Sequence, residues 1–187
     1  MNPPPDRPNG LDRLIEEFRA LPATSDRKRE IVAELDGTPD ALPFLIAVVA
    51  DPQEYDLARV EAATILRLWP PSDPATARTA AHALLTALND PEDDLVRQYA
   101  AEALGPYADD PAVHEALAAS LEPYEDPLVR DNALAAVEEA GPSDARTDVL
   151  RALTRDRDLG RAAARTLTAW GRKPDAGAVS SNQGLRY

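Results

Sequence analysis

The stretch DLVRQYAA at residues 94–101 decides the fold, because three other segments share its pattern of leucine two positions before an arginine and alanine three positions after it. These segments are DLARVEAA at 56–63, PLVRDNAL at 127–134 and DLGRAAAR at 158–165. The four arginines are spaced 38, 33 and 31 residues apart. A second marker, the apolar residue that ends the preceding helix, keeps nearly the same spacing at Val49, Leu88, Leu121 and Leu153. Two markers with one period indicate an array of repeated structural units.

Helical patterns fill the chain between and around these segments. Apolar residues follow one another at helical spacing from Leu11 to Leu21, and Ser25 is placed to cap a helix that runs to about Leu35. No alternating apolar and polar run is bounded by hairpin turns, so we expect no sheet. The predicted fold class is all-α, an α-solenoid of about five antiparallel helical hairpins. Its further helices are expected over 42–49, 54–68, 74–88, 94–105, 111–121, 127–140, 144–154 and 158–170.

The two ends of the chain differ from the middle in composition. Residues 1–9 read MNPPPDRPN, and the residues from about 172 onward are rich in Gly, Ser and Ala without a helical stripe. We therefore expect a disordered N-terminal tail over 1–9, the solenoid over 10–171 and a flexible C-terminal tail over 172–187. Because the two tails carry a net +2, the charge of −13 on the whole chain becomes about −15 on the solenoid.

The second and third segments carry a family resemblance. The run from Asp90 to Gly105, DPEDDLVRQYAAEALG, resembles a HEAT repeat of the short bacterial type, and the run from Glu125 to Val137 is similar. The first and fourth segments depart from the pattern, because Ala58 and Gly160 replace the valine. The resemblance implies an α-solenoid over about 160 residues. It leaves the function open, because such arrays serve many roles.

The repeated positions have an expected role in packing. A helical hairpin cannot bury its apolar face alone, so neighbouring hairpins stack into a continuous core. The small side chains of Ala62, Ala100, Ala133 and Ala164 would let the second helices lie close to their neighbours. We expect the space between layers to be filled by Leu57, Leu95, Leu128 and Leu159.

Acids in the turns and arginines early in the second helices predict a ladder of ion pairs. In HEAT-like arrays such residues make contacts between helices and between repeats. The resemblance therefore implies a structural role for the arginines rather than an anion-binding row. In this ladder Asp51, Asp90, Asp126 and Asp156 are placed to serve Arg59, Arg97, Arg130 and Arg161.

Composition excludes several classes of function. With 33 acidic and 20 basic residues, the chain is a poor general binder of nucleic acid or of an anionic membrane. It has no cysteine, so disulfides, thiol nucleophiles and thiolate metal sites are impossible. The longest apolar stretch, Leu42 to Ala50, is shorter than the ~20 residues of a membrane span. No signal-peptide pattern is present, so we expect a cytoplasmic protein, and its many arginines are typical of a GC-rich bacterial genome.

No motif for catalysis or metal binding stands out in the sequence. His82 and His114 are the only histidines, and a zinc site usually needs more nitrogen or sulfur ligands. The sequence contains no nucleophile elbow, phosphate loop or HExxH motif. Carboxylates that are close by chance are no evidence for a glycosidase dyad. We therefore predict no enzyme activity, no metal and no cofactor.

Aromatic and acidic residues predict an interaction face. Trp69, Tyr107 and Trp170 end second helices, where we expect them to plug the core. In a curved array the second helices line the concave surface, which is a common binding face. That face would carry Glu61, Gln98, Tyr99, Glu102, Asp131 and Asn132. It is either a solvated acidic surface or a groove for a basic or polar partner.

These observations favour a non-enzymatic protein–protein interaction module, a scaffold or adaptor that presents an acidic concave face to a basic or polar protein. One alternative is a HEAT-like enzyme of the DNA glycosylase or bilin lyase type. The acidic charge disfavours the first of these and the aromatic content of 5% disfavours the second. The other alternative is a purely structural spacer or an oligomer subunit.

Overall fold

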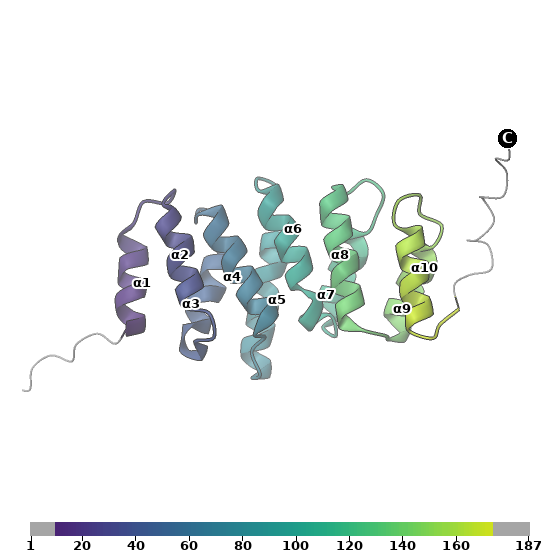
Figure 1. Ribbon diagram of the computed structural model, residues 1–187, viewed down its shortest axis with the longest axis horizontal. Coiled ribbons are helices and arrows are strands. Elements are labelled where there is room, and N and C mark those ends of the chain that lie inside the picture. The colour runs from purple at the N-terminus through teal and green to yellow at the C-terminus, as the bar shows by residue number, and fades with distance from the viewer. Residues whose placement is uncertain (1–9, 174–187) are drawn as a thin grey trace, which may run out of the picture. The chain divides into compact units, whose positions relative to one another are not determined.

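The computed structural model describes residues 10–173, and all regular secondary structure in that range is helical (Figure 1). The all-α prediction is confirmed. The predicted N-terminal tail and residues 174–187 of the predicted C-terminal tail lie outside the described residues. The α-helices are α1 (Gly10–Ala20), α2 (Asp26–Glu34), α3 (Leu42–Ala50), α4 (Asp56–Leu68), α5 (Pro74–Leu88), α6 (Asp94–Ala103), α7 (Pro111–Ser120), α8 (Pro127–Ala140), α9 (Asp144–Leu153) and α10 (Gly160–Ala169). Two short 3-10 helices are η1 (Pro39–Ala41) and η2 (Gly105–Tyr107).

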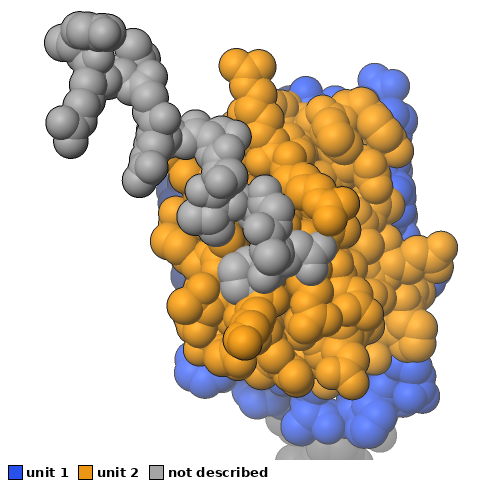
Figure 2. Space-filling view, turned by 90° about the vertical axis from the view of Figure 1, so that its right-hand side faces the viewer, with its two compact units in different colours: residues 1–103 blue, residues 104–187 orange. Residues whose placement is uncertain are grey.

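The helices form two compact units, which Figure 2 colours separately. The first unit, up to Ala103, contains the hairpins α1/α2, α3/α4 and α5/α6. In it α4 packs between α2 and α6, and α3 packs on α5, so that second helices contact second helices and first helices contact first helices. Its core is aliphatic, with fully buried side chains such as Ile31, Val49, Leu66 and Leu84.

The second unit, from Leu104 onward, contains η2 and the hairpins α7/α8 and α9/α10. The short helix η2 packs against α8, and the glycine that begins it explains the close approach. A Cβ atom at Gly105 would lie 3.0 Å from a Glu139 carboxylate oxygen and 3.3 Å from the Ala136 carbonyl oxygen. A larger residue at this position would push η2 away from α8.

Aspartate and proline together define three of the helix starts. The side chains of Asp73, Asp110 and Asp126 accept hydrogen bonds from backbone N–H groups of the first turn, and proline follows each of them. Proline is suited to this position because its missing N–H would have no partner there. Ser143 caps α9 in the same way, whereas Ser25, the cap predicted from the sequence, makes no such bond.

Several helix boundaries in the structure differ from the predicted ones. The helix predicted over 94–105 ends at Ala103, because Pro106 cannot continue it and the chain tightens into η2. The helices predicted from 54 and 158 begin two residues later, at Asp56 and Gly160.

The leucines of the repeat were expected to fill the space between layers, and only one of the four is buried. Leu159 is buried, but Leu95 is 37% and Leu128 is 55% exposed, and Leu57 is half-buried. The buried position is one residue later, because it lies four residues before the buried alanine and thus on the same helical stripe. It is occupied by Ala58, Val96 and Val129.

The alanines keep their expected place in three repeats only. Ala62, Ala100 and Ala133 are fully buried, whereas Ala164 is half-buried and the adjacent Ala163 takes the buried position. The buried stripe of α10 is shifted by one residue toward the N-terminus, since its buried residues include Leu159, Ala163, Thr166 and Leu167.

Candidate interaction surfaces and the arginine network

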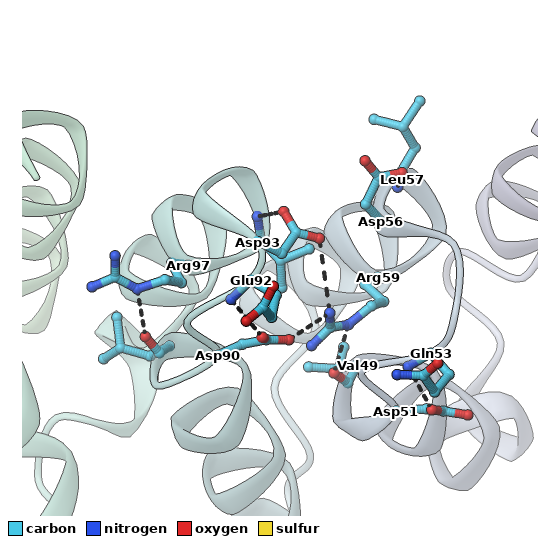
Figure 3. Close-up of polar contacts among 12 residues, drawn as sticks. Val49, Asp51, Gln53, Asp56, Leu57, Arg59, Asp90, Glu92, Asp93 and Arg97 are labelled. Atoms are coloured by element: carbon cyan, nitrogen blue, oxygen red, sulfur yellow. Dashed lines mark hydrogen bonds and ion pairs between the residues drawn. The ribbon is translucent and has the colours of Figure 1, made fainter. Parts of the chain in front are cut away.

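The most deeply buried charged side chain of the described residues is Arg59, which is 1% exposed. In the first turn of α4, its Nε donates to the carbonyl oxygen of Val49 at 3.3 Å, and its Nη1 donates to Asp90 Oδ2 at 2.9 Å (Figure 3). A carboxylate oxygen of Asp93 lies 3.8 Å from the same Nη1. The guanidinium group therefore joins three segments: α4, the end of α3, and the turn between α5 and α6.

Arg130 repeats this arrangement in the second unit. Its Nε donates to the carbonyl oxygen of Leu121 at 3.2 Å, and its Nη2 donates to Asp156 Oδ2 at 2.5 Å. Arg97 in α6 shares the first of these bonds, from Nε to the carbonyl oxygen of Leu88 at 3.1 Å. Arginine Nε thus satisfies a carbonyl group at the end of the preceding helix in all three repeats, where intrahelical partners run out.

The ion pairs differ from those expected. Arg59 and Arg130 do not pair with the acid of their own hairpin but with the acid of the next one, Asp90 and Asp156. The acids of their own turns are used locally. Asp51 accepts the backbone N–H of Gln53, and Asp126 accepts two backbone N–H groups at the start of α8.

Arg161, the fourth arginine of the expected ladder, is exposed. Among residues 10–173 no helix follows α10, so no further turn supplies an acid to it. The expected pairing of Asp156 with Arg161 is wrong for the same reason as above, since Asp156 serves the preceding repeat through Arg130.

The two acids of these pairs are held in their charged form. Burial alone would raise the pKa of the Asp90 carboxyl, but the backbone N–H of Glu92 and the guanidinium of Arg59 outweigh it and lower that pKa. Burial likewise acts to raise the pKa of Asp156, and the backbone N–H groups of Leu159 and Asp158 together with Arg130 lower it. Burial is the largest single influence at both carboxyls, and the hydrogen bonds to the charged form together with the arginine charge outweigh it.

Two further buried cations were missed by the sequence analysis. Arg146 of α9 donates to the carbonyl oxygens of Gly141 at 2.7 Å and Ala108 at 3.1 Å, and to Asp109 at 2.9 Å. Lys28 of α2 donates to Glu54 at 2.7 and 2.9 Å and lies 4.3 Å from the centre of the Phe18 ring. Each stands on the apolar stripe of its helix, three or four residues before a fully buried residue, and that position was the available signal.

In the first unit, the residues predicted for the interaction face lie on α4 and α6. The two acids among them are engaged, since Glu61 lies 3.6 Å from Arg29 and Glu102 accepts a bond of 2.5 Å from Arg67. Both pairs link neighbouring second helices. Gln98 is half-buried, and Tyr99 is 38% exposed next to Leu95, which precedes it by four residues on the same face. This surface is therefore less acidic and more apolar than the sequence suggested.

In the second unit, the predicted residues Asp131 and Asn132 lie on α8. Asp131 is exposed and Asn132 is half-buried. Leu128, four residues before Asn132, is also exposed. The surface of α8 thus repeats the combination of an exposed leucine with polar residues that α6 shows at Leu95.

The aromatic residues expected to plug the helix ends behave differently from one another. Tyr107 is buried, and burial raises the pKa of its hydroxyl. Trp170 is half-buried, and Trp69 is 59% exposed. Trp69 does not plug the core because α4 ends at this residue and two prolines lead the chain away immediately.

Two pockets and the histidines complete the inventory of candidate sites. A pocket of about 280 Å³ lies beside Trp69 in the first unit, and one of about 380 Å³ lies between α7 and α9 in the second. His82 is exposed and His114 is half-buried. Within the described part of the chain, no three His, Asp or Glu side chains are grouped so that they could hold a metal ion. None of the helices over residues 10–173 is long and apolar enough to cross a membrane.

Comparison with known proteins adds one finding. The family description that matches this chain is that of HEAT repeats, over residues 81–169. Among curated proteins and solved structures, none matches the chain.

Proposed function

We propose that the chain is a non-enzymatic interaction module for a protein with a basic surface, because residues 81–169 match the description of HEAT repeats, whose domains are generally protein-interaction scaffolds. The proposed contact residues are those on the outer faces of α4 and α6 in the first unit and of α8 in the second. They are Glu61, Gln98, Tyr99, Glu102, Asp131 and Asn132.

The observation that carries this proposal is the exposed pair of Leu95 and Tyr99 on α6, with Glu102 one turn further along. Tyrosine is among the side chains that supply much of the affinity of a protein interface. The surrounding charge mainly speeds association and selects partners of opposite sign. The net charge of −13 favours a basic partner over an acidic one.

Affinity capture followed by binding kinetics tests the proposal. For the captured partner, Tyr99→Ala should mainly raise the dissociation rate. Glu102→Lys combined with Asp131→Lys should slow association, and the slowing should shrink as salt rises, because screening acts within about 8–10 Å at ordinary ionic strength.

A matched control separates the charge of Glu102 from its structural bond. Arg67→Gln breaks the same ion pair but leaves the acid in place. Arg67→Gln should leave the association rate with the partner unchanged or raise it slightly. If the variants of these helix faces bind the partner like the unmodified chain, the interface lies elsewhere and the proposal fails.

A further inference from the structure

The first unit contains an apolar pocket that the proposed interaction face does not use. It lies between the loop after α2 and the C-terminal end of α4, with a volume of about 280 Å³. Its walls are formed mainly by Leu42, Leu45, Ile65, Leu68, Trp69 and Pro70. Two of these side chains are unusually exposed for their size, since Leu68 is 60% and Trp69 is 59% exposed.

The local sequence explains why Trp69 stays at the rim. The N–H of Trp69 makes the last bond of α4, to the carbonyl oxygen of Ile65 at 2.9 Å. Pro70 and Pro71 then prevent another helical turn, and Pro71 is itself buried. On the opposite side, Gly37 turns the chain after α2 with a φ of +68°, a conformation that favours glycine. One wall is therefore set by the fixed φ of two prolines, and the other by a turn conformation that favours glycine.

The loops around the pocket carry acids and no base. Asp36 precedes the lining residue Gly37, Asp40 follows the lining residue Pro39, and Asp73 follows the lining residue Ser72. The nearest base in the sequence, Arg67, donates to Glu102 on α6. An apolar pocket with a negative rim discriminates between ligands by both shape and charge.

We propose that this pocket binds one large apolar side chain of a protein partner, and that lysine or arginine residues flank that side chain. The volume is below the ~300–1,000 Å³ typical of small-molecule sites, so it suits a single anchoring side chain better than a cofactor. The flanking cations would face the acids of the rim, and one of them can lie over the ring of Trp69. Because the pocket includes none of the residues of the interaction face proposed above, the two proposals can fail separately.

Tryptophan fluorescence of the full chain tests this site directly. The chain has two tryptophans, so Trp170→Phe leaves Trp69 as the only tryptophan, and excitation that avoids the tyrosines then reports on Trp69. The probes are three acetylated and amidated peptides, KKGLGKK, KKGGGKK and EEGLGEE. We expect KKGLGKK to shift the Trp69 emission to the blue and to bind at least fivefold more tightly than either of the others. Equal binding of KKGLGKK and KKGGGKK would overturn the proposal, because no apolar anchor would then be involved.

Charge variants separate the rim from the general acidity of the chain. Asp36→Lys with Asp40→Lys should weaken KKGLGKK binding at least fivefold. Glu92→Lys with Glu115→Lys makes the same change in net charge at exposed acids outside the pocket lining, and should change binding less than twofold. An equal loss of KKGLGKK affinity in both double variants would show non-specific attraction and would overturn the proposal.

Two further measurements show whether the peptide binds at the pocket and whether a second copy of the chain binds there instead. Tyr99→Ala should leave KKGLGKK binding unchanged, whereas Leu68→Asp, with its helicity checked by circular dichroism, should weaken it at least fivefold. Sedimentation of the unmodified chain should show no association that Trp69→Ala abolishes. If it does show one, a second copy of the chain occupies the pocket, and the proposal is wrong.

Discussion

Arg59 and Arg161 stand at the same position of the repeat, yet one is 1% exposed and the other lies in solvent. Both follow the residue that packs in the core, Ala58 and Gly160 respectively. Two differences accompany this contrast, namely the one-residue shift of the buried stripe of α10 and the contact with the following repeat. Asp90 reaches back to Arg59 from the turn between α5 and α6, and among the described residues nothing follows α10 that could do the same for Arg161. Burial of the arginine at this position therefore accompanies both an acid from the next hairpin and a helix register that turns the arginine toward the core.

The largest expected difference is between Arg59→Ala and Arg161→Ala. Removing Arg59 leaves Asp90 buried without its cation and should lower the free energy of unfolding by about 3–5 kcal/mol. Removing the exposed Arg161 should change it by no more than about 0.5 kcal/mol. Urea unfolding followed by circular dichroism measures both values. Similar midpoints for the two variants would contradict the comparison.

The next effect concerns the start of α10. Gly160 occupies the position of the repeat valine, and a Cβ atom there would lie 2.7 Å from the carbonyl oxygen of Thr154. Gly160→Val should therefore cost about 1–3 kcal/mol of stability, because overpacking forces the helix away from the turn. Gly10→Ala is the control, since nothing lies within 4 Å of a Cβ atom at Gly10. A rise in the unfolding temperature of Gly160→Val would show that α10 can accept the residue of the other repeats.

Arg97 should fall between the two extremes. Its Nε donates to the carbonyl oxygen of Leu88, and its Nη1 lies 3.5 Å from the exposed carboxylate of Asp94 on the same helix. Arg97→Ala should cost about 1 kcal/mol, the net value of a hydrogen bond. Arg78→Ala, an exposed position on α5, should cost about 0.5 kcal/mol or less. Urea midpoints of the pair measure both values, and a loss of stability in Arg97→Ala as large as that in Arg59→Ala would contradict this ranking.

The smallest effect is a pH dependence that depends on Asp90. Its pKa in the folded protein is lowered, whereas in the unfolded chain an aspartate titrates near ~3.9. The stabilisation by the charged carboxylate is therefore fully present above the unfolded pKa and is lost as pH falls through the folded one. Between about pH 5 and pH 3, stability should fall more steeply in the unmodified chain than in Asp90→Asn. Asp94→Asn, at an exposed position, should keep the steep slope.

Much of the fold followed from the sequence because its signals are local and repeated. The helix starts at Pro74, Pro111 and Pro127 agree with the prediction, since a capping aspartate and a proline specify them without help from the rest of the chain. The burial of Val96 instead of Leu95 was also accessible. Leu95 stands four residues before Tyr99, and residues at this spacing lie on the same face of a helix. Because Tyr99 is predicted on the outer face, Leu95 cannot fill the space between layers.

The candidate sites were harder to predict because they depend on neighbours. Whether Glu102 is a free surface acid depends on Arg67, 35 residues away on another helix. The choice of Asp90 over Asp51 as the partner of Arg59 is likewise made by the stacking of hairpins. The pocket beside Trp69 could not be seen in either the periodicity or the motifs, because two loops and two helix ends form it together.

The reach of Arg59 also has a consequence for the order in which the chain folds during synthesis. Asp90 is 31 residues further along than Arg59, so it leaves the ribosome later. At ~5–20 residues per second, the delay is a few seconds, during which α3 and α4 have emerged without the carboxylate that their guanidinium requires. A nascent chain halted after α4 has left the ribosome but before Asp90 has left it should therefore be open to proteases at α4, and it should become resistant once the following turn is released.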